Sequence, residues 1–148
     1  RAQLSDAAVE LNARIVRRHQ LAGPRAERPA LPAIALTTDT SILTAIGNDY
    51  HFDRVFARQV QALARPGDVA VGISTSGNSP DVLNGLVAAH ECGARTIGFT
   101  GQRGGRLRDL ADLCFYAPSE DTALIQQAHI AAWHAICLVV EQDLTPQE

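Results

Sequence analysis

The sequence contains no methionine, even at position 1, and no lysine, so all 13 of its cationic residues are arginines. The missing initiator methionine predicts a processed product or a fragment of a longer chain. The absence of lysine indicates a GC-rich genome. Cysteine is scarce, and the three residues present, Cys92, Cys114 and Cys137, show no Cys-x-x-Cys spacing. This excludes a disulfide framework and a cysteine-based zinc site, and predicts small core residues kept reduced in the cytoplasm.

Composition excludes several further classes of protein. With 148 residues, 46% hydrophobic and 20% charged, the chain has the size of one domain and too many apolar side chains for a disordered protein. A formal net charge of -3 gives no electrostatic case for a nucleic-acid partner. We also expect no membrane partner, because we expect no apolar run to approach the roughly 20 residues needed to cross a bilayer.

The apolar pattern alternates between short runs and helical spacing. Residues 1–20 predict one helix, because Leu4, Ala8, Leu11 and Ile15 share a face, and residues 22–32 predict a proline-rich loop. Four short apolar runs predict buried strands, at residues 33–36, 69–73, 96–99 and 114–116. Helices are predicted over residues 40–46, 52–64, 80–90, a short stretch after 105, and 122–143, with Ser119 or Asp121 capping the last one.

Buried strands that alternate with helices are typical of a parallel sheet with helices on both faces. The sequence therefore predicts a three-layer α/β domain with a doubly wound parallel sheet. We expect a single domain overall, with an N-terminal helix and loop over residues 1–24 followed by the sheet-containing part over 25–148. Four strands are few for such a sheet, which predicts that its N-terminal part is incomplete.

A hydroxyl-rich run, Ser-Thr-Ser-Gly-Asn-Ser at residues 74–79, joins the second predicted strand to a helix that starts at Pro80. Open α/β sheets bind ligands at the carboxyl ends of their strands, and a helix N-terminus favours anions. The run predicts a phosphate site; capping of the helix by the same hydroxyls is the alternative. The Gly-Lys-Ser/Thr of a nucleotide-triphosphate loop is absent, which argues against a triphosphatase.

Three other segments carry polar groups. Residues 37–40 and 47–50 follow the first predicted strand, and there Asn48 and Asp49 either bind sugar hydroxyls or serve an ordinary turn. The glycine-rich run 101–105 is weak evidence for a phosphate loop and favours a flexible turn. The last helix carries Gln126, Gln127, His129 and His134 among apolar residues, where a histidine is either a ligand or a satisfied core group.

The sequence resembles the sugar isomerase (SIS) domain family, and within it the phosphoheptose isomerases. The resemblance covers residues 27–144 in order. It rests on residues 28–36, on 43–49, on 74–79, on Thr100-Gly101 with Gly104-Gly105, and on Ile125-Gln126 with His129 and His134.

The resemblance implies a flavodoxin-like fold, a homotetramer and, in many members, zinc. It implies conversion of sedoheptulose 7-phosphate to D-glycero-D-manno-heptose 7-phosphate, a step towards lipopolysaccharide heptose. Carried over by position, Ser74, Thr75, Ser76 and Ser79 match the phosphate loop, and Asn48 and Asp49 match a substrate contact. Gln126 matches a residue that binds substrate and metal, His134 matches the catalytic and metal-binding histidine, and His129 matches a histidine with no such role.

The resemblance ends near the N-terminus. The family carries Asn-Gly-Gly-Ser, then Asp-Ala-Gln-His and a catalytic Glu four residues after that histidine. If Asp6-Ala7 is aligned with the family's Asp-Ala, Val9 takes the place of the histidine and Ala13 that of the glutamate. Either residues are missing from the chain, or its first helix does another job.

Two functional classes follow from this pattern. The first is an enzyme, an aldose–ketose isomerase in which His134 is the visible acid–base group and the family's Glu base is not found. The second is a non-catalytic scaffold or regulator, such as a replication-initiator-associating protein or a sugar-phosphate sensor. The retained hydroxyl-rich run favours the enzyme over the scaffold. On a straight helix, Gln126 and His134 would lie ~12 Å apart, which is too far for both to bind one metal ion. A shared ion therefore needs an irregular helix or a site built from two subunits.

Overall fold

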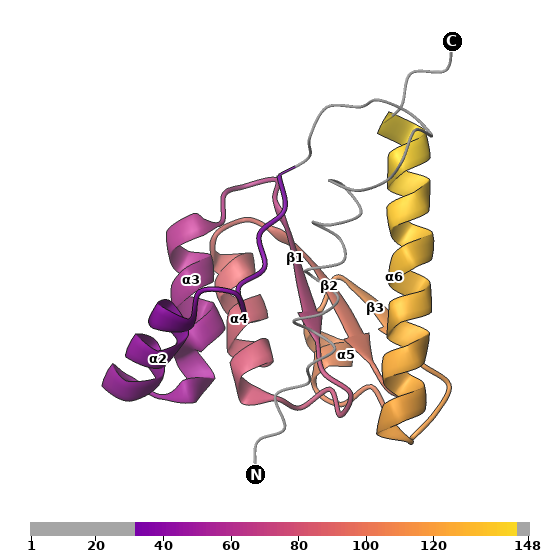
Figure 1. Ribbon diagram of the computed structural model, residues 1–148, viewed down its shortest axis with the longest axis horizontal. Helices are drawn as coiled ribbons and strands as arrows, with labels where there is room; N and C mark the ends of the chain where they lie inside the picture. Colours follow the sequence, from indigo (N-terminus) through magenta and orange to yellow (C-terminus); the bar gives the residue numbers. More distant parts are fainter. Residues whose placement is uncertain (1–31, 145–148) are drawn as a thin grey trace. The chain divides into compact units, whose positions relative to one another are not determined.

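The structure is a computed structural model that describes residues 32–144 (Figure 1). The predicted helix over 1–20 and most of the predicted loop over 22–32 lie outside the described residues. The chain divides into two compact units. One is Asp39–His129, and the described part of the other consists of residues 32–38 and 130–144.

The unit Asp39–His129 contains a parallel sheet of three strands in the order β1-β2-β3 (Figure 1). The strands are β1 (Val69–Ile73), β2 (Arg95–Thr100) and β3 (Leu113–Tyr116). Val71 is in register with Ile97, and Ile97 with Leu113. The three predicted strands over 69–73, 96–99 and 114–116 are confirmed, as is the parallel α/β fold class.

The predicted strand over residues 33–36 is wrong. Ile34 is 68% exposed, and the backbone goes from an irregular segment into a turn at residues 36–38. The backbone N–H and the hydroxyl of Thr38 both donate to the Ala35 carbonyl, at 3.4 and 2.9 Å. An apolar run becomes a strand only where a ladder of hydrogen bonds takes up its backbone groups, and here a local turn uses one of the carbonyls.

The predicted helices within the described residues are all present. They are α2 (Thr40–Asp49), the 3-10 turn η1 (Phe52–Arg54) continued by α3 (Val55–Leu63), α4 (Pro80–Glu91), α5 (Leu107–Leu110) and α6 (Thr122–Leu144). Asp39 caps α2 by accepting the N–H of Ile42 at 2.9 Å. Of the two caps predicted for α6, Asp121 is the one used: its Oδ1 accepts the N–H groups of Ala123 and Leu124.

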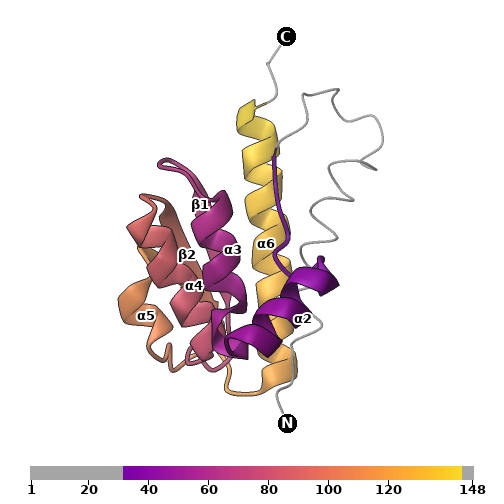
Figure 2. The ribbon, with the colours of Figure 1, turned by 90° about the vertical axis from the view of Figure 1, so that its left-hand side faces the viewer.

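Helices cover both faces of the sheet within this unit. On one face lie α4 and α5 (Figures 1 and 2). Their Leu83, Leu86 and Leu107 form a cluster that packs against Ala70 of β1. On the other face, Phe99 of β2 is fully buried and meets the ring of His129 from the second turn of α6. Successive residues of a strand point to opposite faces, which is how β2 serves both layers. The predicted three-layer arrangement is confirmed.

Helix α6 corrects the expectation about apolar runs. Residues Thr122–Val140 form a stretch of 19 residues with mean hydropathy 1.5, long and apolar enough to cross a bilayer by length and composition alone. The first two turns of this helix pack within the domain, where Ile125 and His129 are buried against the sheet. The apolar character of those turns is explained by packing within the domain.

No disulfide joins the three cysteines, all of which are half-buried. Burial raises the pKa of the Cys114 thiol, and a hydrogen bond with Tyr116 partly offsets that rise. The expectation of core positions is only partly met, and reduced thiols stay a prediction.

Candidate functional site

Residues 74–79, here called the serine loop, connect the end of β1 to the start of α4. The N–H of Ser74 donates to the Phe99 carbonyl at 2.9 Å, which fixes the start of the loop to the neighbouring strand. The N–H of Gly77 donates back to the Ser74 carbonyl at 3.0 Å, and Gly77 has a φ of +68°. The turn needs the left-handed backbone that glycine adopts most easily, so the loop folds back on itself at the carboxyl edge of the sheet.

The serine hydroxyls converge inside this loop. Ser74 Oγ lies 2.9 Å from Ser79 Oγ and 3.4 Å from Ser76 Oγ, and Ser74 is only 5% exposed. Ser76 Oγ also accepts the N–H of Asn78 at 3.2 Å. Three hydroxyls that share one small volume can redirect their protons towards a tetrahedral anion, because a hydroxyl rotates to suit its partner.

The capping alternative is not what the structure shows for this helix. Ser79 occupies the N-cap position of α4, but its side chain makes no capping hydrogen bond. Asp81 in the first turn instead accepts backbone N–H groups, including that of Val82, while burial is the largest influence on its carboxyl and raises its pKa. The hydroxyl of Ser79 lies against that of Ser74 and makes no capping bond to the helix, so the phosphate site stays a prediction that capping by Ser79 does not replace.

The glycine-rich run over residues 101–105, here called the glycine loop, packs directly against the serine loop. A Cβ atom at Gly77 would collide with the Gly104 carbonyl, and one at Gly105 would lie 2.5 Å from the Ser76 carbonyl. The N–H of Gly101 donates to the Thr75 carbonyl at 3.0 Å. The turn favoured by the sequence is present, closed by the N–H of Gly104 donating to the Gly101 carbonyl at 3.1 Å, and its backbone packs against the serine loop.

Asn78 ties the same two loops together through its side chain. Its Nδ2 donates to the Ser76 carbonyl at 3.0 Å, and its Oδ1 accepts the N–H of Arg106 at 3.0 Å. The N–H of Leu107 also donates to the Gly77 carbonyl at 2.9 Å. The sequence analysis did not predict this contact. The available signal was an Asn-containing turn after one strand and two adjacent glycines after the next strand.

The nearby arginine does not add a free positive charge. Arg103 of the glycine loop forms a two-pronged ion pair with Glu120, with distances of 2.8 and 2.6 Å. The hydrogen bond from Arg103 lowers the pKa of the Glu120 carboxyl and is the largest cause of that shift. The Arg103 guanidinium is thus already paired, and the donors that the serine loop itself supplies are hydroxyl and amide groups.

Asn48 and Asp49 lie at the end of α2 and are exposed. Asn48 Nδ2 donates to Asp49 Oδ1 at 2.9 Å. Within the described residues, no hydrogen bond that we observe links either side chain to the serine loop. Their predicted placement just after a strand is wrong, because the strand over 33–36 is absent; their role in substrate binding stays a prediction.

Gln126 and His129 lie in the first two turns of α6, within the same unit as the serine loop. The helix approaches that loop through Ile125, whose side chain would meet a Cβ at Gly101, the residue bonded to Thr75. Gln126 is half-buried beside it. His129 is 2% exposed, and its Nε2 lies 3.0 Å from the Thr100 carbonyl oxygen. His129 is thus a core residue, whereas Gln126 sits at the edge that carries the serine loop.

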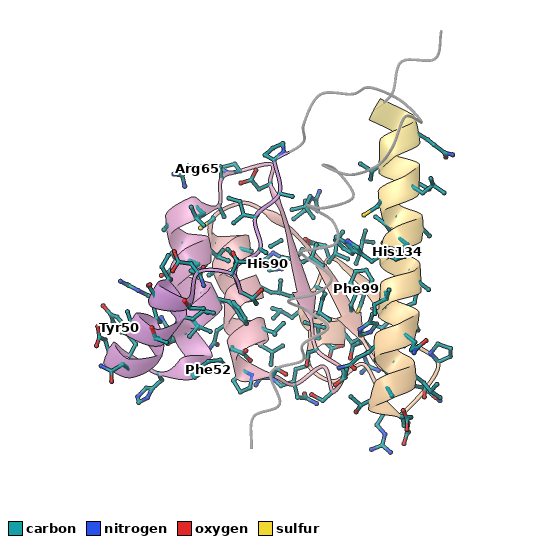
Figure 3. All side chains as sticks on the ribbon, in the orientation of Figure 1. Tyr50, Phe52, Arg65, His90, Phe99 and His134 are labelled. Carbon is teal, nitrogen blue, oxygen red and sulfur yellow. The ribbon has the colours of Figure 1, made fainter. Side chains whose placement is uncertain are left out.

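His134 belongs to the second unit and is half-buried on α6 (Figure 3). Helix α6 runs without a break from Thr122 to Leu144, which excludes the irregular helix. Gln126 and His134 are therefore about 12 Å apart along the axis, far beyond a pair of metal bonds of ~2 Å each. In residues 32–144, no group of three or more His, Cys, Asp and Glu side chains could hold a metal ion. The described residues of a single chain therefore do not fit a zinc ion.

A model of the SIS domain matches residues 8–101, more than half of the chain. The chain belongs to the SIS domain family. A solved SIS-fold structure of a phosphoheptose isomerase from Francisella tularensis superposes with a TM-score of 0.85 at 35% identity, covering 92% of this chain and 72% of that one. A phosphoheptose isomerase from Neisseria gonorrhoeae gives a TM-score of 0.82 at 43% identity, covering 91% and 71%.

Curated SIS domain relatives agree with these structures. A phosphoheptose isomerase of Roseiflexus sp. (strain RS-1) is 59% identical over 120 residues, which is 81% of this chain and 61% of the relative. The chain thus spans about three fifths of the length of the curated relatives that it matches. The resemblance to phosphoheptose isomerases within the SIS family is confirmed over the part that aligns.

Proposed function

We propose that this SIS domain acts as a phosphoheptose isomerase, which interconverts sedoheptulose 7-phosphate and D-glycero-D-manno-heptose 7-phosphate. The observation that carries the proposal is the converging hydroxyl cluster of Ser74, Ser76 and Ser79 at the carboxyl edge of a parallel sheet. The identities of 54–60% to curated phosphoheptose isomerases support the substrate class. They favour this function over the scaffold or regulator.

In this proposal the serine loop holds the phosphate of the sugar. The hydroxyls of Ser74, Ser76 and Ser79, together with Thr75, donate hydrogen bonds to the phosphate oxygens. Binding the phosphate at one end anchors the open-chain sugar, so that its C1 and C2 reach a fixed place in the site. Gln126, Asn48 and Asp49 bind the sugar hydroxyls between the two ends.

The chemical step moves a proton between C1 and C2 through an enediol or enediolate. It needs a base near those carbons and a group that stabilises or protonates the oxyanion. His134 is the acid–base residue proposed from this chain, since imidazole serves both roles near neutral pH. If Asp6-Ala7 is aligned with the family's Asp-Ala, Ala13 stands where the family's Glu base would be, so the base of this proposal is not identified.

We also propose the assembly and setting that accompany this activity: a homotetramer in the cytoplasm that supplies heptose for lipopolysaccharide. A zinc ion enters this proposal only if Gln126 and His134 of different copies share it, since residues 32–144 of one chain do not fit the ion. No chemical step is routed through the metal.

The test is turnover of sedoheptulose 7-phosphate by the purified chain and by His134→Gln. The substitution keeps the volume and some hydrogen bonding but removes the titratable ring, so we expect turnover to fall by at least ~100-fold, as for loss of a general acid or base. His90→Gln is the matched control, because His90 lies at the far end of α4, where it contacts Thr96 and Leu110. No turnover by the unmodified chain would refute the function, and normal turnover by His134→Gln would refute the role of His134.

A further inference from the structure

Thr100, the last residue of β2, joins three parts of the domain. It is fully buried, and its carbonyl oxygen accepts the N–H of Ala117 at 2.8 Å. The same oxygen lies 3.0 Å from Nε2 of His129 on α6, and the Thr100 hydroxyl donates to the Gly104 carbonyl at 3.3 Å. One residue therefore connects α6 with the glycine loop.

The imidazole of His129 is held in a single state. A carbonyl oxygen only accepts, so Nε2 carries the proton and donates it to Thr100. The other nitrogen, Nδ1, is buried with no hydrogen-bond partner in the described part of the chain. The ring lies edge-on to Phe99 and Phe115, at centroid distances of 5.6 and 6.1 Å. Burial lowers the pKa of His129, which keeps the ring neutral.

From Thr100 the contacts continue to the serine loop. Gly101 follows directly, and it is enclosed between Ile125 of α6 and the Thr75 carbonyl, which accepts its N–H. Gly104, which accepts the Thr100 hydroxyl, lies against Gly77 of the serine loop without room for a side chain. Two short routes thus lead from the His129–Thr100 contact to the predicted phosphate donors.

We propose that His129 is a positioning residue: its Nε2–H holds the end of β2, and through the glycine loop it sets the geometry of the serine loop for phosphate. The proposal rests on the proposed function for the phosphate site at the serine loop and for the identity of the sugar, whereas the contacts that link His129 to the loop are independent of it. His129 is buried and bonded to the Thr100 carbonyl, so it acts through Thr100. The same hydrogen bond docks α6, so it also places Gln126 at the edge of the site.

A mere packing role for His129 makes a different prediction. If the ring only fills space, His129→Phe conserves that role, because phenylalanine suits an aromatic pocket. If the Nε2–H matters, His129→Gln is the conservative change, because the glutamine Nε2 reaches about the same position and donates. Phe115→Leu is the matched packing control, since it trims a ring that contacts His129 without removing the hydrogen bond.

The experiment is calorimetric titration of these variants with inorganic phosphate and with sedoheptulose 7-phosphate, beside amide NMR spectra of Gly77 and Gly101. We expect His129→Phe to raise the phosphate Kd about tenfold and to shift both amide signals, roughly the effect of one lost hydrogen bond. His129→Gln and Phe115→Leu should keep the Kd within about threefold of the unmodified chain. Equal Kd values and unmoved amides in His129→Phe would overturn the proposal, as would a His129→Gln variant that fails like His129→Phe.

A second variant covers the case in which His129→Phe does not fold. Thr100→Val keeps the shape and the carbonyl of Thr100 but removes the hydroxyl that reaches Gly104, so it should weaken phosphate binding to a similar degree, and Thr100→Ser should restore it. Full phosphate affinity in Thr100→Val would overturn the proposal. If inorganic phosphate binds as expected but sedoheptulose 7-phosphate does not, the proposed function fails while the positioning role stands. Absence of phosphate binding by the unmodified chain would refute both.

Discussion

Among the serines of the loop, Ser74 and Ser76 differ in a way that matters for experiment. Ser74 is buried and bonded to Ser79, so removing its hydroxyl disturbs the fold of the loop as well as any ligand. Ser76 is exposed, and its hydroxyl has only the Asn78 N–H and a long contact to Ser74 to lose. Ser76 is therefore the better residue for testing ligand binding.

Ser76→Ala should weaken binding of sedoheptulose 7-phosphate by about tenfold, the effect of one hydrogen bond to a charged group. Titration against the unmodified chain measures this directly. Ser41→Ala is the control, because Ser41 is an exposed serine on α2 outside the loop. Unchanged affinity in Ser76→Ala would remove that hydroxyl from the phosphate site.

His129 also makes the stability of the domain depend on pH. Its ordinary pKa is near 6.5, and burial in the folded state lowers it, so the unfolded chain binds a proton first as the pH falls. The free energy of unfolding should therefore decrease as the pH drops below about 6.5, until the pH reaches the folded-state pKa. Above about 6.5, this group should make no difference to the pH dependence.

Urea unfolding at pH 7.5 and pH 5.5 measures the effect. In His129→Phe the decrease between the two pH values should be smaller than in the unmodified chain, since the titrating ring is gone. The lowered pKa of Asp112, due first to its hydrogen bond with the Thr96 N–H, acts at more acidic pH and does not interfere. An identical decrease in both proteins would show that His129 is not buried in its neutral form.

At the scale of elements, the serine and glycine loops behave as one structure. Gly77→Ala places a Cβ against the Gly104 carbonyl and adds left-handed strain, at a cost of order 1–3 kcal/mol. We expect lower stability and loss of phosphate binding. Gly67→Ala is the matched control: Gly67 has a φ of +93°, but nothing lies within 4 Å of its added Cβ.

Thermal unfolding and phosphate titration of the two variants separate strain from collision. Both should lose stability through strain, but only Gly77→Ala should lose phosphate affinity. If the two variants bind phosphate equally well, the contact between the loops does not shape the site.

The sequence predicts elements well where the pattern is local. Val69–Ile73 is a continuous apolar run that ends in a turn, and Pro80 is suited to the first turn of a helix, so both boundaries were predicted correctly. The run over 33–36 is also wholly apolar, but pairing with a neighbouring strand is a tertiary property that no local pattern contains. The support given by the glycine loop was missed for the same reason, since Gly77 and Gly104 are distant in sequence.

In the candidate site too, the features set by the local sequence were predicted and those set by tertiary contacts were not. The serine loop was predicted because a strand, a hydroxyl-rich turn and a helix follow one another in the chain. The role of His129 could not be predicted, because it depends on Thr100, and the sequence shows only a histidine on an apolar helix. Asn48 and Asp49 were placed through a strand that does not form.

For the whole molecule, we predict a homo-oligomer, a tetramer with the last helix at an interface. The second half of α6 exposes apolar side chains in the described residues: Ile136, Leu138, Val139 and Val140, with exposed fractions of 38–54%. The predicted first helix, expected at the other interface, lies outside the described residues. A run of exposed apolar residues on one helix favours burial against another copy.

Light scattering should give a mass well above the 15.8 kDa of one chain, near four times that value. Val139→Asp should lower the mass, because a charge in an apolar interface is costly. Val87→Asp, an equally drastic change at an exposed valine of α4, should leave the mass unaltered. A mass of about 16 kDa for the unmodified chain at micromolar concentration would refute the oligomer.

The unbroken course of α6 has a consequence for how this gene can change. Gln126 and His134 are separated by a fixed number of helical residues, and one inserted or deleted residue between them turns everything beyond it by about 100°. A surface loop absorbs such a change, but a continuous helix passes it on to every later residue. Functional variation between these two positions is therefore confined to substitutions, and a single-codon insertion there should be as harmful as the loss of a site residue.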